Sequence, residues 1–335
     1  MKRYTGEPIV PGARIAVVAN DALGNFVIAT PLLQMLRAAH TPASLDFFGG
    51  LRTAELQSAS DLIDSARNLH GPPIAEALES VAEAGTYDLV VNLEAGPLAQ
   101  VAAGMLAGCE GSVVGPCSGP GGRGTLASAD DDRGRLAADP NWMRPDLLAA
   151  YPFLQSPWIG EIFCRVAYLE GPIPPYRLPS ATPQGEIPEI LIATAASGAD
   201  KLWHGWSEAL ELLRMRSRSV GLLGAPPAAQ RAFWQGDDLE ERLVKEGLVH
   251  DLRGKFTLPE VVGALSLAKA VFTLDNGIMH LAAATPTPTV ALFRPGIRRL
   301  WAPPSGTLHA LEPAEGCPVS SIPIKDVLEA LDAVL

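Results

Sequence analysis

The stretch Phe272-Thr-Leu-Asp-Asn-Gly-Ile-Met-His-Leu-Ala-Ala-Ala-Thr-Pro-Thr-Pro-Thr-Val-Ala-Leu-Phe-Arg-Pro295 decides the fold class of this chain. The apolar run 270–274 predicts a strand buried on both faces, which ends at the turn-forming residues 275–277. A helical segment follows over 278–284, and a second apolar strand over 289–293. A strand that passes through a Gly turn into a helix and on to another strand is the unit of an open parallel sheet. Such a turn gathers backbone N–H groups and the positive end of a helix dipole at one place, which suits a phosphate.

Two side chains near this phosphate position are candidates for contact with a ligand. Asp275, at the end of the strand, is placed to hold a hydroxyl-rich ligand, and its alternative role is a helix N-cap. His280 lies one turn into the helix, where it either hydrogen-bonds a phosphate or packs as a core histidine. The unit as a whole predicts a site for a sugar nucleotide.

The length and composition of the chain limit the class of protein to which it can belong. With 335 residues the chain exceeds what one hydrophobic core usually organises, so two domains are expected. Apolar residues make up 47% and charged residues 19%, which is typical of a soluble globular protein. No apolar run approaches the roughly 20 residues of a membrane span, and the N-terminal residues do not lead into a signal peptide. We therefore expect a cytoplasmic protein, for which only a peripheral contact with a membrane stays open.

The net charge and the spacing of the cysteines argue against a nucleic-acid-binding, a metal-binding or a disulfide-rich protein. The net charge is −11, and residues 1–155 hold 10 Lys/Arg against 17 Asp/Glu, a net of −7. No basic stripe is present, so nucleic acid is not an expected partner. The four cysteines have neither CxxC spacing nor neighbouring histidines, so we expect no metal site and no disulfide framework.

The first half of the chain alternates strand and helix patterns, which is typical of a parallel sheet. The expected strands are 14–19, 45–48, 88–93 and 113–114, and the expected helices are 26–39, 54–60, 74–84, 97–106 and 158–169. The passage from Gly115 to Asn141 is rich in Gly, Pro, Ser and Asp. It predicts a long irregular loop, which is either a lid over substrate or a loose excursion.

The alternation resumes after a Pro-rich passage over 171–188. Strands are then expected at 190–194, 219–223, 248–251, 270–274 and 289–293, and helices at 206–213, 239–246, 258–267, 278–284 and 323–334. We therefore expect an α/β chain with a Rossmann-like domain over 1–170, a linker over 171–188 and a second Rossmann-like domain over 189–335. The two parallel sheets are expected to face each other across a cleft lined by the carboxyl ends of their strands.

Three segments, in the same order, resemble glycosyltransferase family nine, the lipopolysaccharide heptosyltransferases. Residues 20–33, Asn-Asp-Ala-Leu-Gly-Asn-Phe-Val-Ile-Ala-Thr-Pro-Leu-Leu, resemble the N-terminal signature of that family. Residues 193–203 are similar to its phosphate segment, in which a small hydroxyl residue precedes a Lys; here these are Ser197 and Lys201. Residues 257–281 are similar to the most specific stretch of the family. That stretch ends with an acidic residue, a Gly and a His at fixed spacing; here these are Asp275, Gly277 and His280.

The resemblance implies a GT-B architecture, with a nucleotide-sugar donor in the second domain and an acceptor in the first. It implies an inverting transfer of a sugar, typically heptose from ADP-heptose, with neither a metal nor another cofactor. The partners are then the nucleotide sugar and a glycan or small-molecule acceptor. Lys201 is implied as catalytic through stabilisation of the leaving diphosphate. The implied donor-binding residues are Ser197, Lys201, Gly224, Asp275, Asn276, Gly277 and His280.

Asn25 departs from the family pattern, because the family has at this position the Asp proposed as general base. A carboxamide orients a hydroxyl group but does not take its proton. Asp21, in the same loop, and Glu94, after the strand 88–93, are the carboxylates that remain on the acceptor side. The catalytic candidates of the first domain are therefore Asp21 and Asn25, and all three residues are candidates for acceptor binding. Two alternatives stay open: a catalytically impaired sugar-nucleotide-binding protein and a GT-B sugar-nucleotide epimerase.

Further charged and polar residues bear on the choice of ligand. Arg294, Arg298 and Arg299 follow the last core strand and either contact donor phosphates or acceptor, or form a solvated cluster. The family often has an acidic residue near position 230, which holds the ribose hydroxyls of the nucleotide. Gln230 is the residue that could form these hydrogen bonds in this chain. The acidic first half favours a neutral or cationic acceptor over a heavily phosphorylated lipopolysaccharide.

Overall fold

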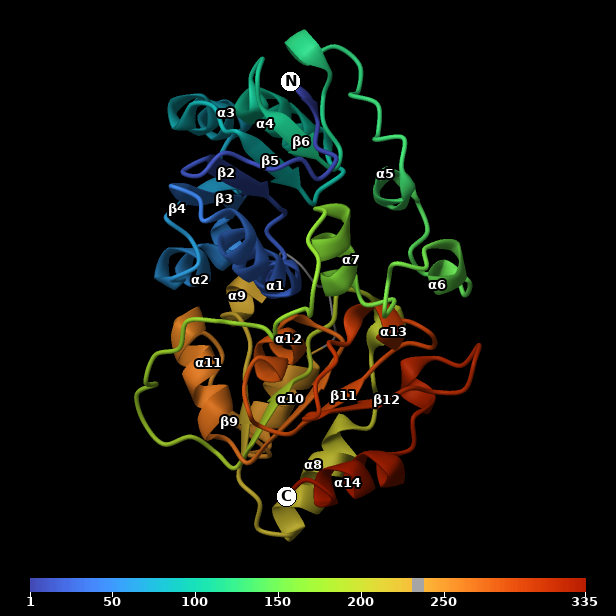
Figure 1. The fold of residues 1–335 in the computed structure, drawn as a ribbon. Coiled ribbons are helices and arrows are strands. Elements are labelled where there is room, and N and C mark those ends of the chain that lie inside the picture. Colours follow the sequence, from blue (N-terminus) through green and yellow to red (C-terminus); the bar gives the residue numbers. More distant parts are fainter. Residues whose placement is uncertain (231–237) are drawn as a thin grey trace. The chain divides into compact units, whose positions relative to one another are not determined.

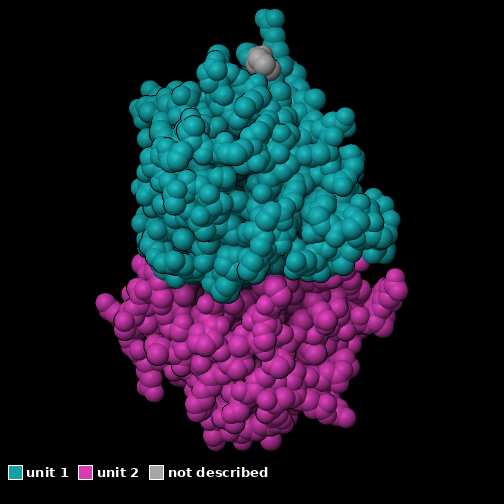
Figure 2. All heavy atoms as spheres, in the orientation of Figure 1, with its two compact units in different colours: residues 1–179 teal, residues 180–335 magenta. Residues whose placement is uncertain are grey.

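A computed structural model describes residues 1–230 and 238–335 of the chain (Figure 1). These residues form two compact units, residues 1–179 and residues 180–335, which Figure 2 shows in two colours. The division falls inside the Pro-rich passage 171–188. Each unit contains one six-stranded parallel sheet, so the α/β class predicted from the sequence is confirmed.

The sheet of unit 1 has the strand order β1-β6-β5-β2-β3-β4. Its strands are β1 (Lys2–Arg3), β2 (Arg14–Val18), β3 (Ser44–Gly50), β4 (Ser65–His70), β5 (Leu89–Asn92) and β6 (Ser112–Val114). The chain runs outward from β2 to β4, and then starts again at β5 on the other side of β2. The strand order therefore reverses between β2 and β5. Open α/β sheets bind their ligands at the carboxyl ends of the strands that flank such a reversal.

Helices cover both faces of this sheet, with α3 and α4 on one side and α1 and α7 on the other (Figure 1). The helices of unit 1 are α1 (Leu23–His40), α2 (Ala54–Ala59), α3 (Ile74–Ala84), α4 (Pro97–Ala107), α5 (Asp132–Ala138), α6 (Leu147–Ala150) and α7 (Ile159–Val166). Helix α4 buries Ala99, Ala102 and Ala103 against the sheet. Strands that are covered on both faces read as continuous apolar runs, which is why β2 and β5 were evident in the sequence.

The sheet of unit 2 has the strand order β12-β11-β10-β7-β8-β9, which matches unit 1 in five strands; its sixth strand, β12, is the last in sequence, whereas β1 of unit 1 is the first. Its strands are β7 (Ile190–Ala193), β8 (Val220–Leu222), β9 (His250–Asp251), β10 (Ala270–Leu274), β11 (Thr289–Leu292) and β12 (Leu308–Leu311). Its helices are α8 (Trp206–Met215), α9 (Pro227–Gln230), α10 (Leu239–Lys245), α11 (Leu258–Leu267), α12 (Gly277–Ala283), α13 (Arg298–Trp301) and α14 (Ile324–Asp332). The order reverses between β7 and β10, so the loops after these two strands are where a ligand is expected in unit 2.

A buried aromatic cluster supports the loop after β7. Trp203 and Trp206 are 1% exposed, and their ring centroids lie 5.3 Å apart in an edge-to-face arrangement. Trp203 also packs on Phe272 of β10, with 5.5 Å between ring centroids, and its Nε1 donates a hydrogen bond of 2.9 Å to the carbonyl of Ile322. Edge-to-face packing with a satisfied indole N–H is a favourable burial of Trp. The end of this loop, including Lys201, is therefore anchored to the core of unit 2.

Three expectations from the sequence need correction. Helix α1 begins at Leu23, so Asn25 lies inside the first turn of the helix rather than in the turn that precedes it. The passage 115–141 is not irregular throughout, because it contains α5, whose N-terminus is capped by Asp131. Strand β4 and the short edge strands β1 and β12 were not predicted. Within residues 1–230 and 238–335, no helix is both long enough and apolar enough to cross a membrane.

Candidate functional site

The reversal of strand order in unit 2 brings together a lysine and an aspartate. Lys201 ends the single-turn helix that follows β7, and Asp275 is the first residue after β10. Lys201 Nζ lies 2.9 Å from Asp275 Oδ2 and donates a second hydrogen bond of 3.2 Å to the carbonyl oxygen of Asp275. The two side chains are 17% and 8% exposed. The predicted phosphate-binding cation and the predicted hydroxyl-binding carboxylate therefore form one mostly buried ion pair.

The cap of helix α12 is Asn276, and not Asp275. Asn276 Oδ1 accepts hydrogen bonds from the N–H groups of Ile278 (3.0 Å) and Met279 (3.3 Å). Its Nδ2 donates to the carbonyl of Ala195 at 3.0 Å, which joins the loops after β7 and β10. A side-chain cap of this kind satisfies N–H groups that a free helix end leaves for a ligand. The phosphate position expected at this turn is thus partly closed by Asn276 itself.

His280 is buried in the same helix. It is 3% exposed, and burial lowers its pKa to about 4, while nearby Asp275 acts in the opposite direction and Lys201 adds to the lowering. The imidazole is therefore neutral near pH 7, so any hydrogen bond that it gives to a phosphate comes from a neutral N–H.

A second ion pair lies beside Lys201. Arg294, which follows β11, pairs with Asp200 at 2.6 Å, and this guanidinium holds the pKa of Asp200 below its usual range. The loops after β7 and β11 are thereby connected through their charged residues. Ser197 lies exposed in the loop after β7. Of the other two predicted arginines, Arg298 lies 3.9 Å from Glu312 in an exposed pair.

The loop after β8 contains Gly224, and it lies against a buried charged network that sequence reasoning missed. A Cβ atom on Gly224 would lie 2.3 Å from Gln230 Nε2 and 3.4 Å from Arg253 Cγ, so a side chain at this position requires the Gln230 side chain to move. Arg253 Nη1 lies 3.0 Å from the buried carboxylate of Glu240. Its Nε and Nη2 bind the two oxygens of Asp251 at 2.9 and 3.0 Å, and this fork holds the pKa of Asp251 below its usual range.

In unit 1, Glu94 lies beside the reversal between β2 and β5. Its Oε2 accepts a hydrogen bond of 2.7 Å from Asn20 Nδ2, and its Oε1 accepts one of 3.1 Å from the N–H of Gly96. Asn20 Oδ1 in turn accepts from the N–H of Ala22 at 2.9 Å, immediately before α1. The carboxylate of Glu94 is therefore fixed in place, and both of its oxygens are already hydrogen-bonded.

Asp21 lies on the other side of the same loop, next to Gly50 at the end of β3. A Cβ atom on Gly50 would lie 2.2 Å from Asp21 Cβ and 3.1 Å from His70 Cβ. The register of β3 and β4 shifts here, so that Gly50 pairs with His70, and such bulges re-aim side chains near functional sites. Within the described residues the carboxylate of Asp21 has no hydrogen-bond partner. Asp21 and Asn25 are both half-buried.

The sequence did not single out His70, because β4 was not predicted. Its Nε2 is buried without a hydrogen-bond partner in the described part of the chain. The pair Gly49-Gly50 was the signal available in the sequence, since consecutive glycines in a strand often mark a bulge or a close approach of side chains.

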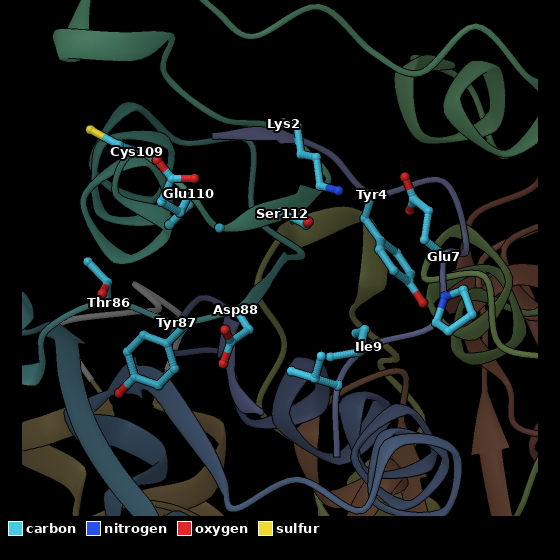
Figure 3. A pocket seen from close by; sticks show the side chains of 14 residues that line it. Lys2, Tyr4, Glu7, Ile9, Thr86, Tyr87, Asp88, Cys109, Glu110 and Ser112 are labelled. Atoms are coloured by element: carbon cyan, nitrogen blue, oxygen red, sulfur yellow. The ribbon is translucent and has the colours of Figure 1, made fainter. Parts of the chain in front are cut away.

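A cavity of about 330 Å³ opens at the opposite edge of the unit 1 sheet (Figure 3). It is lined by residues that precede β5 and β6, such as Asp88 and Glu110, and by the N-terminal segment with Lys2, Tyr4 and Glu7. The labelled side chains in Figure 3 do not include Asp21, Asn25 or Glu94. The cavity is therefore separate from the predicted acceptor residues, which follow the carboxyl ends of β2 and β5.

Residues 176–317 match the model of glycosyltransferase family 9 (heptosyltransferase). A curated relative, lipooligosaccharide heptosyltransferase 2 of Haemophilus influenzae, is 31% identical over 116 residues. The match covers 33% of this chain and 32% of the relative, so it spans about a third of the length of each protein.

Solved structures extend the likeness to both units. A glycosyl transferase family 9 protein of Veillonella parvula has a TM-score of 0.71 and 15% identity, over 97% of this chain and 98% of that chain. The ADP-heptose lps heptosyltransferase II of E. coli has a TM-score of 0.65 and 20% identity, over 96% and 98% of the two chains. Two parallel-sheet units with this likeness define a protein of the GT-B fold. The family match lies in the second unit, over residues 176–317, so this part of the chain is similar to the heptosyltransferases of glycosyltransferase family 9.

Proposed function

We propose that the protein is an inverting, metal-independent glycosyltransferase of the cytoplasm that moves a sugar, heptose from ADP-heptose, to an acceptor hydroxyl. The observation that carries the proposal is the Lys201–Asp275 pair at the strand reversal of the unit that matches the family model. The E. coli relative is named for ADP-heptose, which makes this donor the first to test.

The donor diphosphate is assigned to the loops after β7 and β10. The acceptor oxygen attacks the anomeric carbon of the sugar, and the bond from that carbon to the phosphate oxygen breaks with its electron pair on the diphosphate. Lys201 supplies positive charge where this negative charge grows, and Ser197 and neutral His280 supply uncharged hydrogen-bond donors. Asp275 holds Lys201 in place and lies beside the position of the donor.

The acceptor is assigned to the residues after β2 and β5 of unit 1. Asp21 is the better general base, because its carboxylate has no hydrogen-bond partner within the described residues. Both oxygens of Glu94 already accept hydrogen bonds, from Asn20 Nδ2 and from the N–H of Gly96. Glu94 and Asn25 therefore orient the acceptor hydroxyl while Asp21 takes its proton. The net charge of −7 on this part of the chain favours a neutral or cationic acceptor.

Calorimetric titration of the whole chain with ADP-, UDP- and GDP-linked sugars tests the donor assignment. We expect binding of ADP-heptose, and transfer from it to a neutral glycan that continues in the presence of EDTA. Binding of a different nucleotide class would refute the ADP-heptose assignment. Activity that stops on chelation and returns with a divalent cation would refute the metal-independent mechanism.

Asn25 supports a second candidate, a sugar-nucleotide-binding protein that has lost transfer. Such a protein binds the donor with normal affinity, but it turns over neither as the native chain nor as Asn25→Asp. Transfer by the native chain excludes this candidate, and transfer gained only in the variant identifies a conventional site that lacks its base.

A further inference from the structure

The charged network around Arg253 lies under three loops of the donor-binding edge of unit 2. Glu240, in the first turn of α10, is 2% exposed and accepts a hydrogen bond of 2.6 Å from the hydroxyl of Thr194, the first residue after β7. The other oxygen of Glu240 accepts from Arg253 Nη1 at 3.0 Å. Arg253 also binds both oxygens of Asp251, the last residue of β9. One arginine thus connects the end of β9 to α10 and, through Glu240, to the loop of Lys201.

The same arginine also determines the shape of the loop after β8. The stem of Arg253 lies against Gly224, since a Cβ atom on Gly224 would be 3.4 Å from Arg253 Cγ. The backbone N–H of Gly254 donates to the carbonyl of Gly224 at 2.9 Å. The loops after β7, β8 and β9 therefore share one buried support, although only the first of them contains the lysine assigned to the diphosphate.

The described charges of this network are net negative, whereas Lys201 and Arg294 are balanced by Asp275 and Asp200. Arg253 is surrounded by the carboxylates of Asp251, Glu240 and Glu241, the last at 3.5 Å from Nη1. The cluster therefore carries more negative than positive charge, which repels a diphosphate and tolerates an uncharged nucleoside. An anion is repelled less at the balanced Lys201 group than at the Arg253 cluster, which favours a donor whose phosphates lie near Lys201 and whose nucleoside lies over the Gly224 loop.

We infer that Arg253 is a positioning residue for the nucleoside half of the donor, acting through the Gly224 loop and the end of β9 rather than by contact with the ligand. This inference rests on the proposed function and adds to it one positioning residue. Its requirement is geometric, because the guanidinium binds Asp251 with two parallel hydrogen bonds while Nη1 holds Glu240. A lysine keeps the charge but cannot form this fork.

Arg253→Lys is the test, with ADP and inorganic pyrophosphate as probes titrated into the whole chain at a temperature well below unfolding. We expect ADP binding to weaken tenfold or more, while pyrophosphate, which reaches only the Lys201 end, changes less than twofold. Thr194→Val, which removes the hydroxyl group that links β7 to Glu240, is expected to weaken ADP binding by a smaller factor, about threefold. Arg242→Lys is the matched control, since Arg242 lies on the same helix α10 but is 50% exposed.

The outcomes separate the inference from the proposed function. A native chain that binds neither probe overturns the proposed function, and the inference with it. A native chain that binds ADP, with Arg253→Lys equally tight for ADP in the folded protein, overturns the inference alone. An equal loss of affinity for ADP and for pyrophosphate also overturns the inference, because it indicates a general disturbance of unit 2. If Arg253→Lys does not fold, Thr194→Val decides by the same comparison of the two probes.

Discussion

Replacement of Lys201 by Met is expected to destabilise unit 2 even though no ligand is bound. The Lys201 and Asp275 side chains are 17% and 8% exposed, and their charged atoms lie 2.9 Å apart. At an effective dielectric constant of about 20, this separation corresponds to a gross attraction of about 6 kcal/mol. Most of that attraction offsets the loss of hydration, but removal of one partner leaves a buried carboxylate unpaired. The expected loss in the free energy of unfolding is therefore about 3 kcal/mol.

Urea denaturation measures this loss, followed by tryptophan fluorescence, to which the buried Trp203 and Trp206 of unit 2 contribute together with the other four tryptophans of the chain. The double variant Lys201→Met with Asp275→Asn removes both charges and is expected to recover most of the lost stability. Lys325→Met is the matched control, because Lys325 is 80% exposed and pairs with Glu329 at 3.6 Å, so less than about 1 kcal/mol is expected. A loss at Lys201 as small as that at Lys325, or no recovery in the double variant, would refute the reasoning from a buried pair.

Three further perturbations test other parts of the site. Asp21→Asn is expected to lower the rate of sugar transfer about 100-fold, the usual contribution of a positioned general base; unchanged kcat/KM for the acceptor would contradict the assignment of Asp21 as the base. His280 has a folded-state pKa of about 4, below the roughly 6.5 of an unfolded histidine, so the unfolded state takes up the proton first on acidification. Stability is therefore expected to fall from about pH 6.5 towards pH 4, and His280→Gln should show less of this fall in thermal melts at a series of pH values. Gly50→Ala places a Cβ atom 2.2 Å from Asp21 Cβ and is expected to cost about 2 kcal/mol in chemical denaturation, whereas Gly306→Ala, with no atom within 4 Å, should cost much less.

Periodicity predicted those elements whose apolar residues face a sheet or are buried on both sides. The strand 270–274 and the helices 74–84 and 258–267 have the predicted bounds in the structure. Strand β4, Ser65–His70, was missed because five of its six residues are only half-buried, so that neither an apolar run nor an alternation marks it. Helix α1 starts three residues before the predicted position. The sequence gives no start signal there, because Ala22 precedes the helix without a side-chain cap.

The residues of the candidate site can likewise be separated into those that the sequence pattern predicted and those that it missed. Lys201 and Asp275 follow recognisable strands, and the strand ends of a parallel sheet meet at one edge, so the sequence predicted that the two residues lie at this edge. Their role in binding the donor stays a prediction. Their pairing with each other, and the choice of Asn276 as the cap, depend on side-chain distances that a pattern does not contain. Arg253 was not found because its partners come from separate strands and a helix, and only the folded chain brings them together.

The pairing of Lys201 with Asp275 has a consequence for the end of the catalytic cycle. The ammonium group has a resident counter-ion at 2.9 Å, so an arriving diphosphate competes with a carboxylate for it. We expect this competition to limit the affinity for ADP, the spent half of the donor, and so to speed its departure. Asp275→Asn should then retain ADP longer, which stopped-flow measurement of the dissociation rate can show. The Asp275 carboxylate, which pairs with Lys201 when no donor is bound, is thus also the group expected to displace the diphosphate of the product.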